Sequence, residues 1–372
     1  MVNPKKILYI HGITDLAGGE FFLLNLQKHL PQDKYATYFI LPNEGALTKR
    51  LRQVCPQVHI FAFQGKSFFR KWAAFFKSVG QLVLFVKKHQ IQLIHANDYK
   101  PALMACLAAK IWGIPLIWTI HGPAYNLQNP LKKKLLSFCL KRLISVSHFS
   151  AQRLAAYPES KLEIIPIGID TDKFQPSTGK TRSPKQPLTI TNIGRFDRIK
   201  RLETTILAMH VLKQTNLDFR LLLVANDFHN QPEDYHQEIL DLIQAKQLQD
   251  SIKIMPFTDP IQNIYEQTDI LISTSSFETL GLTIMEAMAC GIPVISTRSG
   301  GPEETILDGQ TGYLIETDDH QALADKINQL ASKPDLARQL GECGRQRILA
   351  NYSIQSMVEE YDKLYTSLFA EQ

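Results

Sequence analysis

Short apolar runs alternate with longer segments of helical periodicity along most of the chain. The apolar runs are bounded by polar or glycine-rich turns, which is typical of buried strands. Alternation of strands and helices predicts a parallel sheet with helices on its faces. The pattern predicts helices over 20–30 and 101–112, and strands near 6–11, 35–41, 92–96, 115–120, 143–146 and 163–167.

A polar segment rich in Pro, Ser and Thr interrupts this alternation at 171–187, and we interpret it as an interdomain linker. Strands and helices then alternate again from residue 188 onward, and no repeat of about 20–50 residues is present. The chain is therefore predicted to be an α/β protein with two doubly wound domains, 1–170 and 188–353, and a cleft between them. An amphipathic helix, 354–372, follows the second domain.

Composition is that of an ordinary soluble globular protein. Of 372 residues, 44% are hydrophobic and 21% are charged, and no apolar run approaches the length of a membrane span, about 20 residues. The N-terminus enters a strand directly, without a signal-peptide pattern. The five cysteines lack CxxC spacing and lie in apolar surroundings, so they are predicted to be reduced core residues of a cytoplasmic protein, not a metal or disulfide set.

Charge is unevenly distributed. Residues 1–165 contain 22 Lys and Arg against 7 Asp and Glu, whereas the remainder contains 19 against 29. This asymmetry indicates an anionic partner for the first half, either a membrane surface or a phosphate-bearing substrate. Two basic and aromatic stretches, 66–88 and 129–143, fit an amphipathic helix at a membrane interface or one packed on the sheet with a solvated basic edge. No nucleic-acid-binding motif accompanies them.

The stretch 273–301 carries the clearest chemical signal. An apolar run ends in small hydroxyl residues, then come Glu278, a helix-like run from about 280 to 290, and a second apolar run. Ligands of open parallel sheets bind outside the carboxyl ends of the strands, where Glu278 is expected to lie. The helix that follows would present free N–H groups suited to a phosphate or a sugar hydroxyl. Gly281 lets the backbone approach a ligand closely.

Glu286 is unusual because its neighbours Met285, Ala287 and Met288 indicate a buried helix face. A carboxylate in such surroundings needs polar partners. It would either cap backbone N–H groups in the core or bind the hydroxyls of a ribose.

Taken together, the two glutamates eight positions apart, the glycine between them and the string AMACGIPVI resemble the Glu-x7-Glu signature of retaining GT-B glycosyltransferases of family 4. The resemblance covers nearly the whole chain and is densest over 165–172, 192–200 and 275–315. It implies a GT-B fold, in which two Rossmann-like domains face each other across a cleft. In that family, a segment like 354–372 packs back on the first domain.

Two elements of the first half fit this resemblance. Gly18 and Gly19 precede a helix, where they would either make a turn or leave N–H groups for an anion; GxGxxG is absent. His121 ends an apolar strand, where a backbone carbonyl or a ligand would satisfy it. In the family, the glycine loop faces the donor diphosphate and the acceptor, and a histidine like His121 contacts the transferred sugar.

In the second half, Arg195 and Lys200 follow a strand and flank a helix entry. They would be solvated charges or a diphosphate site, and they match the family's Gly-Arg-x4-Lys pattern. Arg201 stands where relatives often have glycine. Asp170 and Asp172 mimic an Asp-x-Asp metal motif, but they follow a strand and begin the linker, and the family generally needs no metal.

The resemblance therefore implies a retaining, metal-independent hexosyl- or related glycosyltransferase that uses a nucleotide-diphosphate sugar, with UDP preferred over GDP. Its acceptor would be a glycan or lipid-linked molecule of lipopolysaccharide, polysaccharide or glycolipid synthesis, and it could contact the inner face of the cytoplasmic membrane. The alternative is a catalytically silent binding or scaffold protein of the same fold. The predicted roles are catalytic for Arg195, Lys200, Glu278 and His121, and donor-binding for Gly18, Gly19, Thr279, Leu280, Gly281, Leu282 and Glu286.

Overall fold

The computed structural model divides the chain into two compact units, which we describe separately. The first unit comprises Met1–Gly168 and Ile354–Gln372, and the second comprises Ile169–Ser353. Part of the predicted linker, 178–185, lies outside the described residues. The structure describes residues 3–15, 18–61, 68–122, 130–154, 157–177, 186–226, 234–257 and 260–371, with the backbone alone for 68–75, 130–133 and 226.

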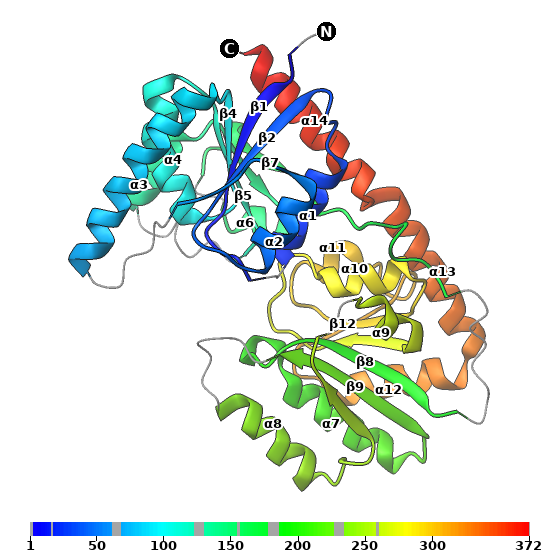
Figure 1. The fold of residues 1–372 in the computed structure, drawn as a ribbon. Coiled ribbons are helices and arrows are strands. Elements are labelled where there is room, and N and C mark those ends of the chain that lie inside the picture. Colours follow the sequence, from blue (N-terminus) through cyan, green and yellow to red (C-terminus); the bar gives the residue numbers. More distant parts are fainter. Residues whose placement is uncertain are drawn as a thin grey trace. The chain divides into compact units, whose positions relative to one another are not determined.

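The first unit is built on a parallel sheet with the strand order β3-β2-β1-β4-β5-β6-β7 (Figure 1). All six strands predicted in this half are present, with ends shifted by at most three residues. β3 was not predicted, because its three residues are only partly buried. The strands are β1 (Lys5–Ile10), β2 (Tyr35–Leu41), β3 (Val58–Ile60), β4 (Leu93–Ala96), β5 (Leu116–Ile120), β6 (Arg142–Ser145) and β7 (Leu162–Ile164), and the helices are α1 (Gly18–His29), α2 (Ala46–Val54), α3 (Phe68–His89), α4 (Tyr99–Trp112), α5 (Pro130–Cys139), α6 (His148–Gln152) and α14 (Ile354–Ala370).

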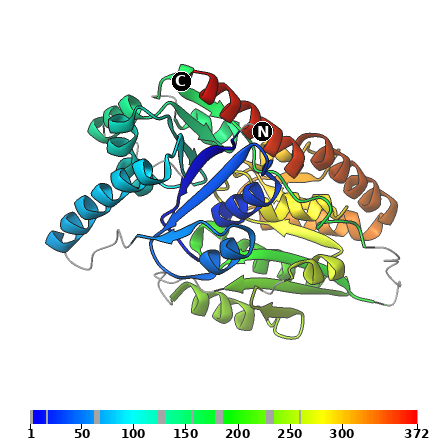
Figure 2. The ribbon, with the colours of Figure 1, turned by 45° about the horizontal axis from the view of Figure 1, so that its top comes forward.

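The side chains of β1 point alternately to the two faces of this sheet. Leu8 and Ile10 belong to an apolar cluster with residues of α3, α4 and α5. Tyr9 points to the opposite face, where it contacts α14. Because successive side chains of a strand alternate in direction, this arrangement requires helices on both faces. Figure 2 shows α14, in red, running close to the N-terminus.

The second unit contains a parallel sheet with the order β10-β9-β8-β11-β12-β13. Its main apolar cluster joins β8, β9 and β11 to α7, α8 and α12. The strands are β8 (Leu188–Arg195), β9 (Phe219–Asn226), β10 (Ile252–Met255), β11 (Ile270–Ser273), β12 (Val294–Thr297) and β13 (Tyr313–Ile315), and the helices are α7 (Leu202–Gln214), α8 (Asp234–Ala245), α9 (Gln262–Gln267), α10 (Leu282–Ala289), α11 (Pro302–Thr305), α12 (His320–Ser332) and α13 (Pro334–Asn351).

Helix α14 is bound to the first unit by a buried polar network. Tyr365 Oη lies 3.0 Å from Tyr9 Oη and 2.8 Å from His95 Nδ1. His95 Nε2 lies 2.8 Å from Thr119 Oγ1, which is 3.0 Å from Tyr361 Oη. Burial lowers the pKa of His95 to about 3, so the ring is neutral. Buried hydroxyls of this kind are costly unless hydrogen-bonded, so the network specifies where α14 docks.

Replacing Tyr365 with phenylalanine keeps the ring but removes the hydroxyl that joins Tyr9 to His95. We expect Tyr365→Phe to lower the free energy of unfolding by about 1–3 kcal/mol, since two buried polar groups lose a partner. Denaturant unfolding measures this loss.

The matched control is Lys363→Ala on the same helix, since Lys363 is exposed and pairs only with Glu360 at 2.7 Å in the described part of the chain. It should change the unfolding free energy by no more than about 0.5 kcal/mol. Equal effects of the two variants would show that the network does not stabilise the docked helix.

Candidate active site

The carboxyl ends of β8 and β11 bring two distant segments of the second unit together. Residues 198–200 form a short 3-10 helix after β8. Ser276 N donates to Ile199 O at 2.7 Å, and Thr274 Oγ1 donates to Lys200 O at 2.9 Å. These bonds fix the backbone of Lys200 against the loop that carries Glu278.

The side chains of Lys200 and Glu278 form an ion pair at this edge. Lys200 Nζ donates to Glu278 Oε1, and Ser275 Oγ donates to the same oxygen at 2.9 Å. The lysine side chain is 20% exposed and the glutamate side chain 18%. The pair is thus shielded from bulk water yet reachable by a ligand, which strengthens its electrostatic interactions.

The loop after Glu278 lies against the turn that follows β12. Glu278 N donates to Ser299 O, and Gly301 N donates to Glu278 O, both at 2.9 Å. A Cβ on Gly301 would overlap the backbone of Leu280, so this close approach requires glycine. Gly281 adopts φ +84° and precedes α10, which begins at Leu282. The backbone of 279–282 is therefore held at the N-terminus of α10.

Glu286 lies on α10, one turn below this N-terminus, and is partly buried. Its partner is a hydroxyl, not the backbone N–H groups considered from the sequence: Tyr265 Oη of α9 donates to Glu286 Oε2 at 2.6 Å. Burial raises the pKa of Glu286 to about 7, against the opposing effects of the Tyr265 bond and of Lys173. This carboxyl group therefore already accepts a bond from an O–H donor.

Arg195 is the last residue of β8, and its side chain is 41% exposed. Its guanidinium lies 3.5 Å from Asp197, whose other carboxylate oxygen accepts from Ile199 N at 3.1 Å. Arg201 adopts a left-handed backbone with φ +48°. That conformation favours glycine, which explains physically why glycine suits this position.

In the first unit, Gly19 and His121 are neighbours. A Cβ on Gly19 would lie 3.3 Å from His121 Cδ2, and the Phe22 ring is 4.7 Å from the imidazole. Gly18 and Gly19 do not precede the helix, as predicted from the sequence, but are the first two residues of α1. Burial and the nearby His11 lower the pKa of His121 to about 3, so this histidine is neutral. It is suited to hydrogen bonding, not to carrying charge.

Three charged residues near His121 were not predicted from the sequence. His11 Nε2 lies 2.7 Å from Glu20 Oε1, and His11 Nδ1 lies 2.9 Å from Asp98 Oδ2. Burial acts to lower the pKa of His11, but the two carboxylates outweigh it and raise the pKa to about 9. Asp98 also accepts from Gly12 N at 2.6 Å. A protonated His11 thus ties the start of α1 to the carboxyl ends of β1 and β4.

The signal that could have revealed this cluster is position. Each of the three residues lies at or next to a strand end or a helix start, but 78 positions separate Glu20 from Asp98. Tyr265 also escaped notice, because an aromatic residue in a short amphipathic helix reads as part of the core.

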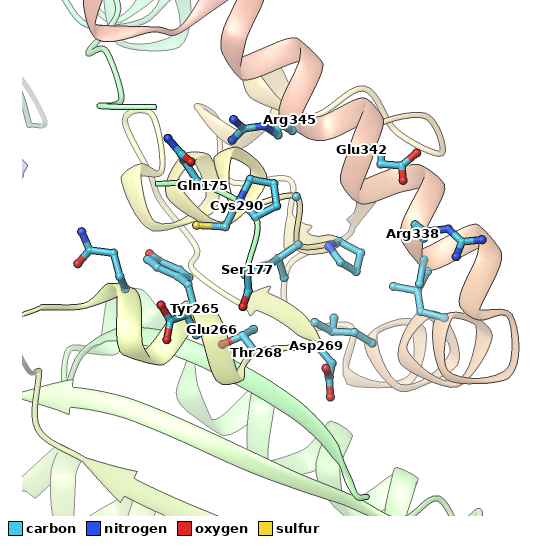
Figure 3. Close-up of a pocket in the computed structure, with 18 of the residues that line it drawn as sticks. Gln175, Ser177, Tyr265, Glu266, Thr268, Asp269, Cys290, Arg338, Glu342 and Arg345 are labelled. Carbon is cyan, nitrogen blue, oxygen red and sulfur yellow. The ribbon is translucent and has the colours of Figure 1, made fainter. Parts of the chain in front are cut away.

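A cavity of about 800 Å³ opens elsewhere in the second unit (Figure 3). Its lining includes Leu188 and Ile270, the first residues of β8 and β11, so it lies at the amino ends of the strands. Lys200 and Glu278 lie at the opposite ends. Tyr265, labelled in Figure 3, is the lining residue that bonds to Glu286. The cavity is therefore distinct from the Lys200–Glu278 edge.

The described residues contain no group of three or more His, Cys, Asp or Glu side chains arranged to hold a metal ion. None of their helices combines the length and apolar character needed to cross a bilayer. The five cysteines are free thiols, and Cys343 is exposed, not part of the core.

Comparison with known proteins assigns both halves of the chain. The family model for Glycosyltransferase Family 4 matches residues 16–173, and the model for Glycosyl transferases group 1 matches residues 174–347. The chain is 26% identical over 360 residues to the N-acetyl-alpha-D-glucosaminyl L-malate synthase of Bacillus anthracis, covering 91% of each chain. It is 24% identical to the capsular polysaccharide biosynthesis glycosyltransferase CapM of Staphylococcus aureus, covering 79% of this chain and 82% of CapM.

The fold is also that of solved glycosyltransferases. The structure of Anabaena HepE in complex with UDP and glucose matches with a TM-score of 0.84 and 21% identity, over 98% of this chain and 100% of HepE. This likeness confirms the predicted GT-B class, in that two parallel α/β units follow one another in one chain. Since the two family models adjoin and together extend from residue 16 to residue 347, the chain belongs to the family 4 (group 1) glycosyltransferases.

Proposed function

We propose that this glycosyltransferase moves a sugar from a nucleotide-diphosphate sugar to a glycan or lipid-linked acceptor, with retention of anomeric configuration and without a metal ion. The observation that carries the proposal is the Lys200–Glu278 ion pair beside the N-terminus of α10. UDP is the preferred nucleotide and GDP the second choice, because the HepE structure holds UDP and glucose. CapM, named for capsular polysaccharide biosynthesis, supports a role in lipopolysaccharide, polysaccharide or glycolipid synthesis.

In this proposal Lys200 bridges the sugar site and the diphosphate. An ammonium group has three N–H donors, and one of them bonds to Glu278. The other two can point to phosphate oxygens, with the Arg195 guanidinium at the end of β8 as the second cation. Positive charge fixed beside the leaving diphosphate stabilises the charge that develops as the glycosidic bond breaks.

Glu278 would hold the donor sugar. Among the described residues, both donors to its carboxylate, Lys200 Nζ and Ser275 Oγ, bond to Oε1. Oε2 is then the oxygen that accepts from a sugar hydroxyl. The N–H groups at the start of α10, over 279–282, would bind further sugar or phosphate oxygens.

Glu286 would hold the ribose. Its oxygen Oε2 accepts from the Tyr265 hydroxyl, and this bond to an O–H donor supports the role. A ribose hydroxyl is a donor of the same kind.

The first unit, including α14, would bind the acceptor. Gly18 and Gly19 would face the diphosphate and the acceptor, and the neutral His121 would bond to the transferred sugar. In the proposed reaction the acceptor hydroxyl attacks the anomeric carbon from the side of the departing diphosphate. The bond from that carbon to the diphosphate breaks, and a phosphate oxygen takes the proton.

The proposed location is the cytoplasm, at the inner face of the cytoplasmic membrane, which fits the excess of basic residues in the first unit.

A thermal-shift screen against UDP-, GDP- and ADP-sugars tests the donor assignment. Binding to the folded state raises the melting temperature by mass action. We expect the largest rise with a UDP-sugar, and we expect EDTA to leave both the rise and the rate of transfer unchanged. NMR of the product anomer should show retention; inversion, or a loss of activity with EDTA that a divalent cation restores, would contradict the mechanism. Donor binding without any transfer or hydrolysis would favour a silent binding protein.

Substitution of Lys200 tests the diphosphate assignment. We expect Lys200→Ala to reduce kcat about 10²–10³-fold, because a positive charge beside the leaving group is lost. Melting temperature should change little, since partly exposed ion pairs contribute about 0–1 kcal/mol. The matched control is Arg198→Ala, which removes a nearby exposed cation paired with Glu238 at 2.5 Å. Near-wild-type turnover of Lys200→Ala would remove Lys200 from the mechanism.

The raised pKa of Glu286, about 7, makes donor binding pH-dependent. The ionised form accepts two hydroxyl bonds better than the protonated form, so we expect donor affinity in calorimetry to increase from pH 6 to pH 8. In Glu286→Gln, affinity should be lower than in wild type at pH 8 and should lack this pH-dependent component.

The free energy of unfolding of the ligand-free protein should change with pH in the opposite direction to donor affinity. Because the pKa of Glu286 is higher in the folded state than its ordinary 4.5, the folded state binds more protons and loses stability as pH rises towards about 7. The Gln variant should lack this loss. A Gln variant that melts far below wild type and has unchanged donor affinity would identify Glu286 as a purely structural residue.

A further inference from the structure

One face of the first unit exposes an unusual number of large apolar side chains. Helix α4 exposes Leu107, Ile111 and Trp112, and α3 and α5 pack against it. In Figure 1, α3 and α4 lie side by side. Phe138 of α5 is 68% exposed and Ile111 is 52% exposed. We define the basic–apolar face by the exposed side chains of Leu84, Leu107, Ile111, Trp112, Leu135 and Phe138, together with Lys87, Lys110 and Lys134.

Contacts between the three helices make this face continuous. Trp112 Nε1 of α4 donates to Val83 O of α3 at 2.9 Å, and Lys87 Nζ lies 5.4 Å from the centre of the indole ring. Lys110 Nζ of α4 lies 3.9 Å from the centre of the Phe138 ring of α5. The exposed surfaces of α3, α4 and α5 therefore adjoin, and a lysine lies over the Trp112 ring and over the Phe138 ring.

The charge of this region is almost entirely positive. Between residues 45 and 158 the sequence has 17 Lys and Arg and one acidic residue, Asp98. Asp98 already pairs with His11 at 2.9 Å. Acidic residues that could neutralise the surface lysines are thus missing from the sequence of α3, α4 and α5 themselves.

A hollow of about 530 Å³ lies at one end of the face, lined in part by Trp112, Phe138, Lys110, Lys141 and Lys161. Lys161 Nζ donates to Ser137 O at 2.7 Å and to Leu140 O at 3.0 Å. Burial lowers the pKa of Lys161, and the positive charges of Lys110, Lys141 and Arg142 lower it further.

One carboxylate, from Glu371, also lines the hollow. It pairs with Lys141 at 2.6 Å and with Arg142 at 3.4 Å. Three lysines against one carboxylate leave the hollow with an excess of positive charge, which an anionic group at its rim would balance.

We propose that the basic–apolar face docks on an anionic lipid bilayer, with Leu107, Ile111 and Phe138 entering the interface and a lipid headgroup phosphate at the rim of the hollow. Apolar side chains with lysines beside them match the acyl boundary and the phosphate layer of such a membrane. The charge selects a bilayer over a second copy of this chain, since two copies of a face without acidic residues repel each other. This inference rests on the proposed function, because it names the partner surface of the proposed acceptor unit. It places α4, which the sequence pattern predicted only as a helix over 101–112, at the centre of the contact.

Vesicle co-sedimentation of the full-length protein tests the proposal. Wild-type protein should bind vesicles that contain phosphatidylglycerol and should bind pure phosphatidylcholine vesicles at least tenfold less. The double variant Ile111→Ser/Phe138→Ser should bind the anionic vesicles about tenfold or more weakly, because two apolar side chains no longer enter the interface. The variant Lys110→Glu/Lys134→Glu should lose binding by at least the same factor, since each lysine near the surface contributes about 1 kcal/mol.

The matched control is Leu240→Ser/Leu307→Ser, which removes two exposed apolar side chains from the second unit and should bind like wild type. Unchanged binding of the face variants, or equal binding to both kinds of vesicle, would overturn the proposal. So would a wild-type dimer in solution that Ile111→Ser/Phe138→Ser dissociates, because a second copy would then cover the face. Donor-induced thermal shifts should be the same in all variants, so a failure of the donor assignment is distinguishable from a failure of docking.

Discussion

The ion pair between Lys200 and Glu278 is the interaction on which the candidate site depends. Parallel strands end at one edge, so residues that follow β8 and β11 meet there although 78 positions separate them. Ser276 N donates to Ile199 O and Thr274 Oγ1 donates to Lys200 O, so the lysine backbone is held independently of the contacts of its side chain. The pair is balanced in charge without a ligand, which lets a cation and a carboxylate stay partly buried at modest cost. A polar ligand can then exchange with bonds that already exist.

The first unit also holds ionisable side chains in its interior, but these are histidines with different neighbours. His11 between Glu20 and Asp98 keeps a protonated ring in the interior because two carboxylates face it, whereas His95 and His121 stay neutral because hydroxyls or apolar rings surround them. Three histidines at three strand ends therefore have different charge states. Their environments, not their positions along the strands, determine these states. His121, beside the Gly19 backbone, is neutral chiefly because it is buried, and the charged His11 nearby lowers its pKa further.

The amino-acid pattern predicted the architecture well because the strands of parallel sheets are continuous apolar runs that short polar turns delimit. Run 35–41 coincides with β2, and run 92–96 begins one residue before β4 and ends with it. Strand β3 was missed because three partly buried residues give no such run. Arg201 shows a different limit. It has a left-handed backbone where the 3-10 helix of 198–200 meets α7, and the propensity of a single residue does not predict such a junction.

Individual site residues were predictable where a local motif carried them and unpredictable where a partner lay far along the chain. Glu278 and Glu286 lie in one loop and helix, so their spacing together with the sequence around them indicated a site. Tyr265, the partner of Glu286, comes from another helix. Hydrophobic periodicity counts tyrosine as apolar, so it does not indicate that the hydroxyl makes a hydrogen bond. The Tyr265 hydroxyl gives the Glu286 carboxyl group a hydrogen-bond donor, without which burial of that group would be costly. The carboxyl group thereby acts as an acceptor for O–H donors. The bond therefore makes a buried glutamate on α10 compatible both with the core and with a ribose.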